Sequence, residues 1–208
     1  GVGQIEGIDP LEPRARYGGE DLPGGPNDAH SSGIFSYVSI RHGGTEIGTA
    51  NEINGLTMGG VGSGTQIDHI EVFQNKDDGY EWFGGTVDCK YLISAFCGDD
   101  NFDIDEGYRG RGQYWFCLLG DDASNRAGEH DGGTTPEDGL PLATPVIWNA
   151  TYIGAGAGAA ADNDLVFMIR DNCAPSYYNS IFVGFKAEAI EVEDLADPLL
   201  EDSCARLE

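Results

Sequence analysis

Apolar and polar residues alternate along short stretches of this chain. In residues 68–72 (DHIEV) and 80–82 (YEW), every second side chain belongs to the apolar class. This two-residue period is typical of a strand that buries one face. The three- and four-residue spacing that a surface helix needs does not occur in these segments. The pattern therefore predicts short strands joined at Gly, Asn and Asp corners.

Pairs of aspartates return at a fixed interval of 22 residues. They are Asp77-Asp78, Asp99-Asp100 and Asp121-Asp122. The same offset predicts two columns of strand residues, Ile70 with Leu92 and Tyr114, and Val72 with Ser94 and Phe116. A repeat of this length that consists of strands indicates a solenoid, in which each turn packs on the next.

Looser copies of the repeat lie on both sides, at residues 36–60, 146–169 and 178–192. We therefore expect an all-β chain that folds as a right-handed parallel β-helix solenoid of about five turns, each of roughly 22 residues. Residues 1–208 are expected to form a single domain. Residues 121–145 are polar and rich in Gly and Pro, which predicts a long inserted loop. Residues 187–208 carry several leucines and are expected to form a C-terminal cap over the open end.

Composition limits the classes of partner that such a solenoid can bind. The chain has 36 Asp and Glu against 11 Lys and Arg, a formal net charge of −25. This excludes binding of nucleic acid or of an anionic membrane through a basic face. No stretch approaches the roughly 18 apolar residues of a membrane span. The chain starts without Met, at Gly1, so we expect a processed chain or a part of a longer β-helix.

Five cysteines occur without a C-x-x-C pair or the spacing of a zinc site. The acidic, lysine-poor and glycine-rich composition favours an extracellular or cell-surface setting, where some of these cysteines can pair. Their odd number leaves at least one without an intramolecular partner.

Several strings in the chain resemble a known family. They are YVSIRHGG (37–44), NEINGLTMGGVGSGT (51–65), IDHIEVFQNKDDGYEWFGGTV (67–87), GDDNFDIDEGYRGRGQYWF (98–116) and NRAGEHDGG (125–133). They are similar to uncharacterised secreted bacterial β-helix proteins of the pectin-lyase-like type, which are often surface proteins or lipoproteins. The resemblance implies the β-helix fold and secretion, but members of this group have no assigned activity.

Stacked aspartates require compensation for their charge. Two carboxylates about 4.8 Å apart repel by roughly 3.5 kcal/mol at an effective dielectric of 20. Ca²⁺ suits such a site because it binds six to eight oxygen ligands in flexible geometry. The candidate ligands are Asp77, Asp78, Asp99, Asp100, Asp121 and Asp122. The alternative is that these aspartates only form turns, because their side chains hydrogen-bond the local backbone.

A second acidic set follows on the next strand. Glu81 aligns with Asp103 at the same offset, and Arg109 and Arg111 lie just beyond Asp105. Carboxylates flanked by Arg resemble the groove of β-helix polysaccharide lyases, so a lyase would use Asp103, Asp105, Arg109 and Arg111. The alternative is that these acids face solvent and pair with the two arginines. His130, within the expected inserted loop, is a further candidate ligand.

Two classes of function remain open. The first is a secreted or cell-surface β-helix with a structural or binding role, stabilised by Ca²⁺ and assembling with other copies of the chain; it has no enzymatic activity. The second is a carbohydrate-active protein that acts on polysaccharide, either a lyase or a carbohydrate-binding module with exposed Tyr or Trp as stacking surfaces.

Overall fold

The computed structural model describes residues 27–46, 53–121, 124–133, 138–159, 164–187 and 189–192. These residues contain strands and no helix. The strands are β1 (Ile34–Arg41), β2 (Leu56–Gly59), β3 (Gln66–Phe73), β4 (Tyr80–Phe83), β5 (Cys89–Ala95), β6 (Phe102–Asp105), β7 (Arg111–Gln113), β8 (Phe116–Leu118), β9 (Gly128–His130), β10 (Val146–Trp148), β11 (Thr151–Ile153), β12 (Phe167–Ile169), β13 (Ser176–Tyr178), β14 (Ile181–Val183) and β15 (Ile190–Val192).

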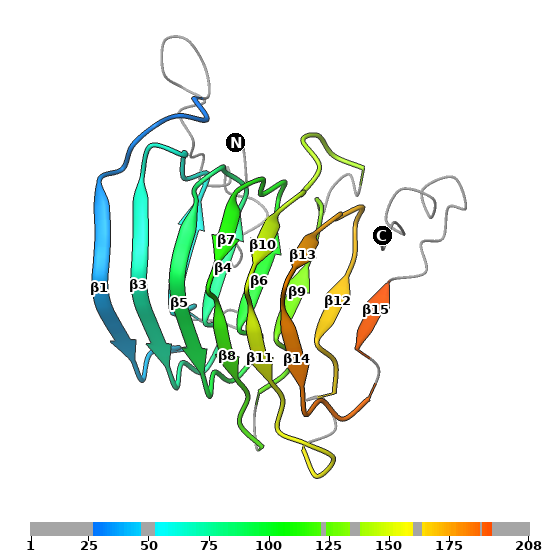
Figure 1. The fold of residues 1–208 in the computed structure, drawn as a ribbon. Helices are drawn as coiled ribbons and strands as arrows, with labels where there is room; N and C mark the ends of the chain where they lie inside the picture. The colour runs from blue at the N-terminus through cyan, green and yellow to red at the C-terminus, as the bar shows by residue number, and fades with distance from the viewer. Residues whose placement is uncertain are drawn as a thin grey trace.

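The strands form two parallel sheets. The nine-stranded sheet contains β1, β3 and β5, followed by the strand pairs β7 and β8, β10 and β11, and β13 and β14. The six-stranded sheet has the order β15-β12-β9-β6-β4-β2. The chain crosses from one sheet to the other in every turn and advances from β1 to β15 as a right-handed coil (Figure 1). The right-handed parallel β-helix expected from the sequence is confirmed.

The period of 22 residues applies only to the centre of the solenoid. Val72 pairs with Ser94 at that offset, but Ser94 then pairs with Cys117, so Phe116 does not continue the predicted column. Likewise Lys90 pairs with Gln113, which aligns Tyr114 with Tyr91 rather than with Leu92. Extra residues at the corners lengthen a turn without changing the strand spacing, because backbone hydrogen bonds fix that spacing. The described residues complete six turns, one more than expected.

The predicted inserted loop and cap both need correction. Residues 128–130 lie inside the expected loop 121–145, yet they form β9, which pairs with β6 and β12. Residues 190–192 lie inside the expected cap 187–208, yet they form β15, which pairs with β12. Both strands have three residues, which is too short for a clear alternation in the sequence. The remainder of the expected cap, residues 193–208, lies outside the described residues.

Aromatic side chains fill the space between the sheets. Trp82 stacks on Trp115 with ring centroids 5.0 Å apart, and Phe102 lies 4.9 Å from Trp115. All three side chains are at most 1% exposed. Successive turns place inward residues above one another, so rings from neighbouring turns stack along the axis.

The four described cysteines lie in this core and form no disulfide with one another. Cys89, Cys97, Cys117 and Cys173 are buried, and Cys204 lies outside the described residues. Burial raises the pKa of Cys89 to about 12. The expected pairing is therefore absent among the four described cysteines. Within the described part of the chain, no helix has the length and hydropathy to cross a membrane.

Each turn of the nine-stranded sheet bends at one residue with a left-handed backbone. These residues are Tyr37, His69, Tyr91, Tyr114, Asn149 and Asn179, with φ between 50° and 59°. Residues other than Gly adopt this conformation infrequently. The bend directs two successive side chains outward. The first four rings form an external stack, with neighbouring centroids 4.4, 4.5 and 5.1 Å apart.

Candidate functional site

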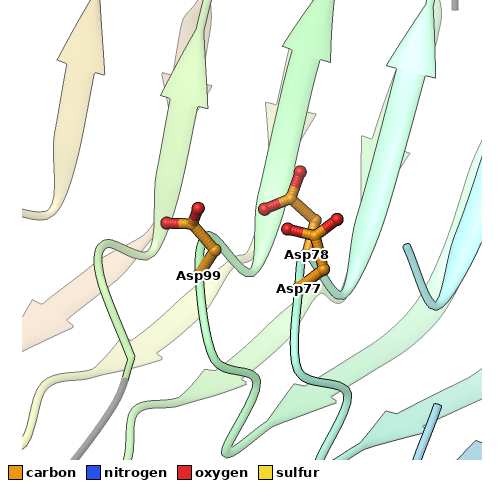
Figure 2. A group of neighbouring side chains, drawn as sticks. All are labelled: Asp77, Asp78 and Asp99. Carbon is orange, nitrogen blue, oxygen red and sulfur yellow. The ribbon is translucent and has the colours of Figure 1, made fainter. Parts of the chain in front are cut away.

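Three aspartates converge at one corner of the solenoid. Asp77, Asp78 and Asp99 lie in the loops that lead into β4 and β6, on adjacent turns (Figure 2). One carboxylate oxygen from each lies within 4.8 Å of the others. Asp78 is buried, whereas Asp77 and Asp99 are half-buried. We call these three residues the acidic corner.

Asp78 and Asp100 also join consecutive turns. Asp78 Oδ1 accepts a hydrogen bond of 2.9 Å from the backbone N–H of Asp100. Asp100 Oδ1 accepts one of 2.9 Å from the N–H of Arg126. Both carboxylates therefore link consecutive turns, whereas the alternative to cation binding had them bond the local backbone only. One oxygen of each side chain is engaged in this way.

Asp121 does not continue the predicted columns. The backbone N–H of Asn125 bonds the carbonyl oxygen of Asp99, and its side chain bonds the Asp99 carboxylate. Asn125 and Arg126 thus occupy the positions that follow Asp99 and Asp100, at an offset of 26 residues. Asp121 lies earlier in the chain and is exposed. Asp122 lies outside the described residues.

Burial and like charge act together at this corner. Desolvation, followed by the charges of Asp100, Glu81, Asp77 and Asp99, raises the pKa of Asp78 well above its ordinary value. The pKa of Asp100 is also raised by burial, although Arg126 opposes this effect. The charges that act most strongly on Asp78 are therefore all carboxylates.

A second row of carboxylates follows the outer side of the six-stranded sheet. Glu81 on β4 pairs in register with Asp103 on β6, and the pairing of β6 with β9 places Glu129 next. Asp78, Glu81 and Asp103 form a second group whose oxygens lie within 4.8 Å of one another. Burial raises the pKa of Asp103 well above its ordinary value and also raises that of Glu129.

The structure does not bring the predicted lyase residues together. Arg109 binds Asp28 at 2.9 Å. Arg111 lies on β7 in the nine-stranded sheet and binds Asp88 through several hydrogen bonds. The expected pairing of both arginines with the acids of β6 is thus replaced by other partners. Asp105 Oδ1 accepts a hydrogen bond from the N–H of Glu106.

The architecture and the sequence agree on one family. A family model described as a pectate-lyase-like beta helix domain matches residues 15–201. The chain belongs to this family. No curated protein and no solved structure matches the chain. Membership as a pectate-lyase-like β-helix indicates a carbohydrate-related or structural role, and it supports the β-helix resemblance in the sequence.

Two arginines that the sequence did not indicate compensate the acidic row of this pectate-lyase-like domain. Arg170 contacts Glu129 at 2.9 Å and Asp131 at 2.7 Å. Arg126 contacts Glu129 at 3.0 Å. Arg126 follows Asp100 after 26 residues and Arg170 follows Asp131 after 39, so no fixed spacing marks these arginines in the sequence. The later turns therefore carry positive charge beside their acids, whereas the largest effects on Asp78 come from burial and other carboxylates.

His130 is a core residue of this domain and not an exposed ligand. Its side chain is fully buried, and its Nε2 lies 2.8 Å from the hydroxyl of Tyr177. Burial lowers the pKa of His130 to about 4. The imidazole is therefore neutral at pH 7 and is used in packing.

Proposed function

We propose that this pectate-lyase-like domain is an extracellular or cell-surface structural β-helix whose acidic corner binds Ca²⁺. The observation that carries the proposal is the convergence of Asp77, Asp78 and Asp99 within 4.8 Å. The strongest electrostatic effects on Asp78 come from other carboxylates. A divalent cation would offset their repulsion where the turns meet.

The donor set suits Ca²⁺ better than a transition metal. Carboxylate oxygens are hard ligands, and the described cysteines are buried in the core. Asp78 uses one oxygen to hold the N–H of Asp100, which fixes the direction of the other. Ca²⁺ accepts six to eight oxygens, so water and backbone carbonyls would complete the coordination.

Thermal unfolding of chelated protein, with and without CaCl₂, tests this proposal. A ligand at 100 times its Kd stabilises the native state by about 2.7 kcal/mol, which raises Tm by roughly 5–10 °C for a chain of this size. We expect Asp99→Asn to lose most of this increase, because Asn keeps the volume but removes a charged ligand. Asp121→Asn, at an exposed position outside the corner, is the matched control. An equal increase in both variants, or no heat on calorimetric titration of the parent protein, would refute a site at this corner.

Assembly with other copies is part of the same proposal. The first described turn carries half-buried inward residues such as Phe35 and Leu56, and the last carries Tyr177 and Ile190 in the same columns. These residues occupy corresponding inward positions, so head-to-tail stacking would continue both sheets. Light scattering over a range of protein concentrations should show growth beyond a monomer. A constant monomer mass at the highest concentration would contradict assembly.

A polysaccharide lyase is the second candidate function. It is favoured by the raised pKa of Asp103 beside a row that contains Glu129 and Arg170. A carboxyl group with a raised pKa is suited to proton transfer. Incubation with uronic-acid polymers and Ca²⁺, followed by ultraviolet absorbance of unsaturated products, tests it. Activity that is lost in Asp103→Asn but kept in Asp121→Asn would support the lyase, and no absorbance change on any polymer would exclude it.

A further inference from the structure

The outer face of the nine-stranded sheet differs from the rest of this acidic molecule. From β5 onward, four successive turns present three columns of outward residues, which we call the outer array. The first column is Lys90, Gln113, Trp148 and Tyr178. The second is Tyr91, Tyr114, Asn149 and Asn179. The third is Ile93, Phe116, Thr151 and Ile181.

No residue of the outer array carries a carboxylate, and Lys90 is its single charged residue. Every side chain in it is exposed or half-buried. The preceding turn places Asp68 and Glu71 in the first and third columns. Within these three columns, acidic residues therefore stop at β3; Asp88 lies beside the first column and is bound by Arg111.

Two aromatic rings in the array, Tyr114 and Trp148, each have one face stacked on another ring. Tyr114 stacks on Tyr91 with centroids 5.1 Å apart, and Trp148 stacks on Tyr178 at 5.8 Å. On the opposite side, Trp148 pairs in register with Gln113. Tyr114 is followed in its column by Asn149, because the Tyr114 N–H bonds the carbonyl oxygen of Trp148. The second face of Tyr114 and that of Trp148 thus lie toward an amide side chain and not toward another ring.

Two shallow grooves flank these rings. One, of 240 Å³, lies against Trp148, Gln113 and Lys90. The other, of 340 Å³, lies against Tyr91, Tyr114 and Phe116, and Glu71 of the preceding turn also lines it. Arg111 lines the first groove but is held by Asp88. Its guanidinium is therefore already neutralised by a carboxylate.

We propose that the outer array binds a neutral polysaccharide, with Trp148 and Tyr114 as stacking surfaces. Gln113 and Asn149 would hydrogen-bond the sugar hydroxyls beside these rings. An aromatic face next to an amide group matches a pyranose ring, which has an apolar face and a polar edge. This inference goes beyond the proposed structural role and uses different residues.

The charge of the molecule selects among possible occupants. A net charge of −25 repels anionic polymers, whereas a neutral polymer experiences no such repulsion. The array contains polar amides and hydroxyls between its rings, so it suits a hydrated partner better than the core of a protein interface. A chain of sugars could extend across successive turns, which lie about 4.8 Å apart.

Retention of the full chain on immobilised polysaccharides tests this inference. The probes are cellulose, chitin, mannan, β-1,3-glucan and starch, with alginate and polygalacturonate as anionic comparisons. We expect binding to at least one neutral polymer that is unchanged in 0.5 M NaCl, because charge screening does not affect it. Trp148→Ala should weaken binding about tenfold, as expected for loss of a principal aromatic contact. Gln113→Ala should weaken it to a smaller extent.

Two controls separate recognition from damage to the fold. Trp148→Tyr keeps an aromatic ring and should restore most of the binding. Tyr37→Ala removes an exposed ring from the same face at the first turn, outside the array, and should bind normally. Repeating the assay in chelator separates this inference from the Ca²⁺ site, since folded protein should still bind.

Three results would overturn the inference. The first is no retention on any neutral polymer, and the second is retention on anionic polymers alone. The third is equal binding by the parent protein and Trp148→Ala. Self-association that disappears in Trp148→Ala would assign the face to a second copy of the chain instead.

Discussion

Single residues in this protein show how burial changes the use of a polar side chain. His130 packs beside Phe167 and Tyr177, with ring centroids 5.0 and 6.0 Å away. Its pKa is lowered to about 4 because the charged form is desolvated. The same physical cause acts in the opposite direction on Asp78, where it raises the pKa and favours the neutral acid.

The titration of His130 predicts a loss of stability in acid. In the unfolded chain this histidine gains a proton below about pH 6.5, whereas in the folded chain it resists protonation down to about pH 4. The unfolded state therefore binds more protons in this interval, and stability falls as the pH falls from 6.5 to 4. The contribution is about 3 kcal/mol. His130→Phe should reduce this decrease in the free energy of unfolding, measured by urea unfolding between pH 7 and 4. A slope identical to that of the parent protein would contradict the assignment.

Arginines in different surroundings should contribute unequally to stability. Arg170 joins the half-buried Glu129 to the buried Asp131, so its removal takes the Arg170 cation away from Asp131 and leaves Glu129 with Arg126 alone. We expect Arg170→Met to lower the free energy of unfolding by about 3 kcal/mol or more. Arg111→Met removes an exposed ion pair with Asp88 and should cost less than about 1 kcal/mol. Equal losses in denaturant titrations would show that the two pairs do not differ in this way.

Corners between strands control how closely consecutive turns approach. At the acidic corner, a Cβ on Gly98 would lie 2.1 Å from the carbonyl oxygen of Lys76 on the preceding turn. The backbone N–H of Gly98 also bonds the carbonyl oxygen of Asn75. The close approach of these two backbones is part of what brings Asp77 and Asp99 together.

Gly98→Ala should therefore lower stability by about 1–3 kcal/mol, because the added methyl group forces two turns apart. Gly158→Ala is the matched control, since a Cβ there meets nothing within 4 Å. We expect the control to change stability by no more than about 0.5 kcal/mol. Thermal or urea unfolding measures both. The argument fails if the two substitutions have the same effect.

At the scale of the whole molecule, the contacts that stabilise the fold and the net charge have opposite effects on stability. Hydrogen bonds between turns and stacked aromatic side chains hold the solenoid together, while a net charge of −25 opposes the compact state. The charge is unevenly distributed, because the outer array lacks carboxylates and the six-stranded sheet carries a row of them. This asymmetry gives the two faces different chemistry.

Self-repulsion predicts a dependence of stability on ionic strength. Raising NaCl from 10 mM to 0.5 M shortens the Debye length from about 30 Å to a few ångströms, so we expect Tm to increase in chelator. Comparing Tm in MgCl₂ and in CaCl₂ at the same ionic strength distinguishes general charge screening from Ca²⁺ binding at the acidic corner. A further increase specific to CaCl₂ is expected. A decrease of Tm with NaCl would contradict the importance of self-repulsion.

The amino-acid sequence by itself determined the class of fold. Alternation is a local signal, and it shows which residues of 68–72 point inward. The regular interval of 22 residues between the three acidic pairs indicates stacked turns. It also indicated the convergence of Asp77, Asp78 and Asp99, since the central turns keep the period of 22 residues. A period cannot reveal an insertion at a corner, so it placed Asp121 and Phe116 in the wrong columns.

Only the tertiary structure decided which charges meet. Arg126 follows Asp100 in its column after 26 residues, and Arg170 reaches Asp131 from the next turn. These contacts depend on hydrogen-bonded strand register, which three-residue strands such as β9 do not reveal in a sequence. The burial of His130 and the acid-free outer array have the same origin. The turns have unequal lengths, but the constant spacing of the strands brings them into one register. Both features follow from this.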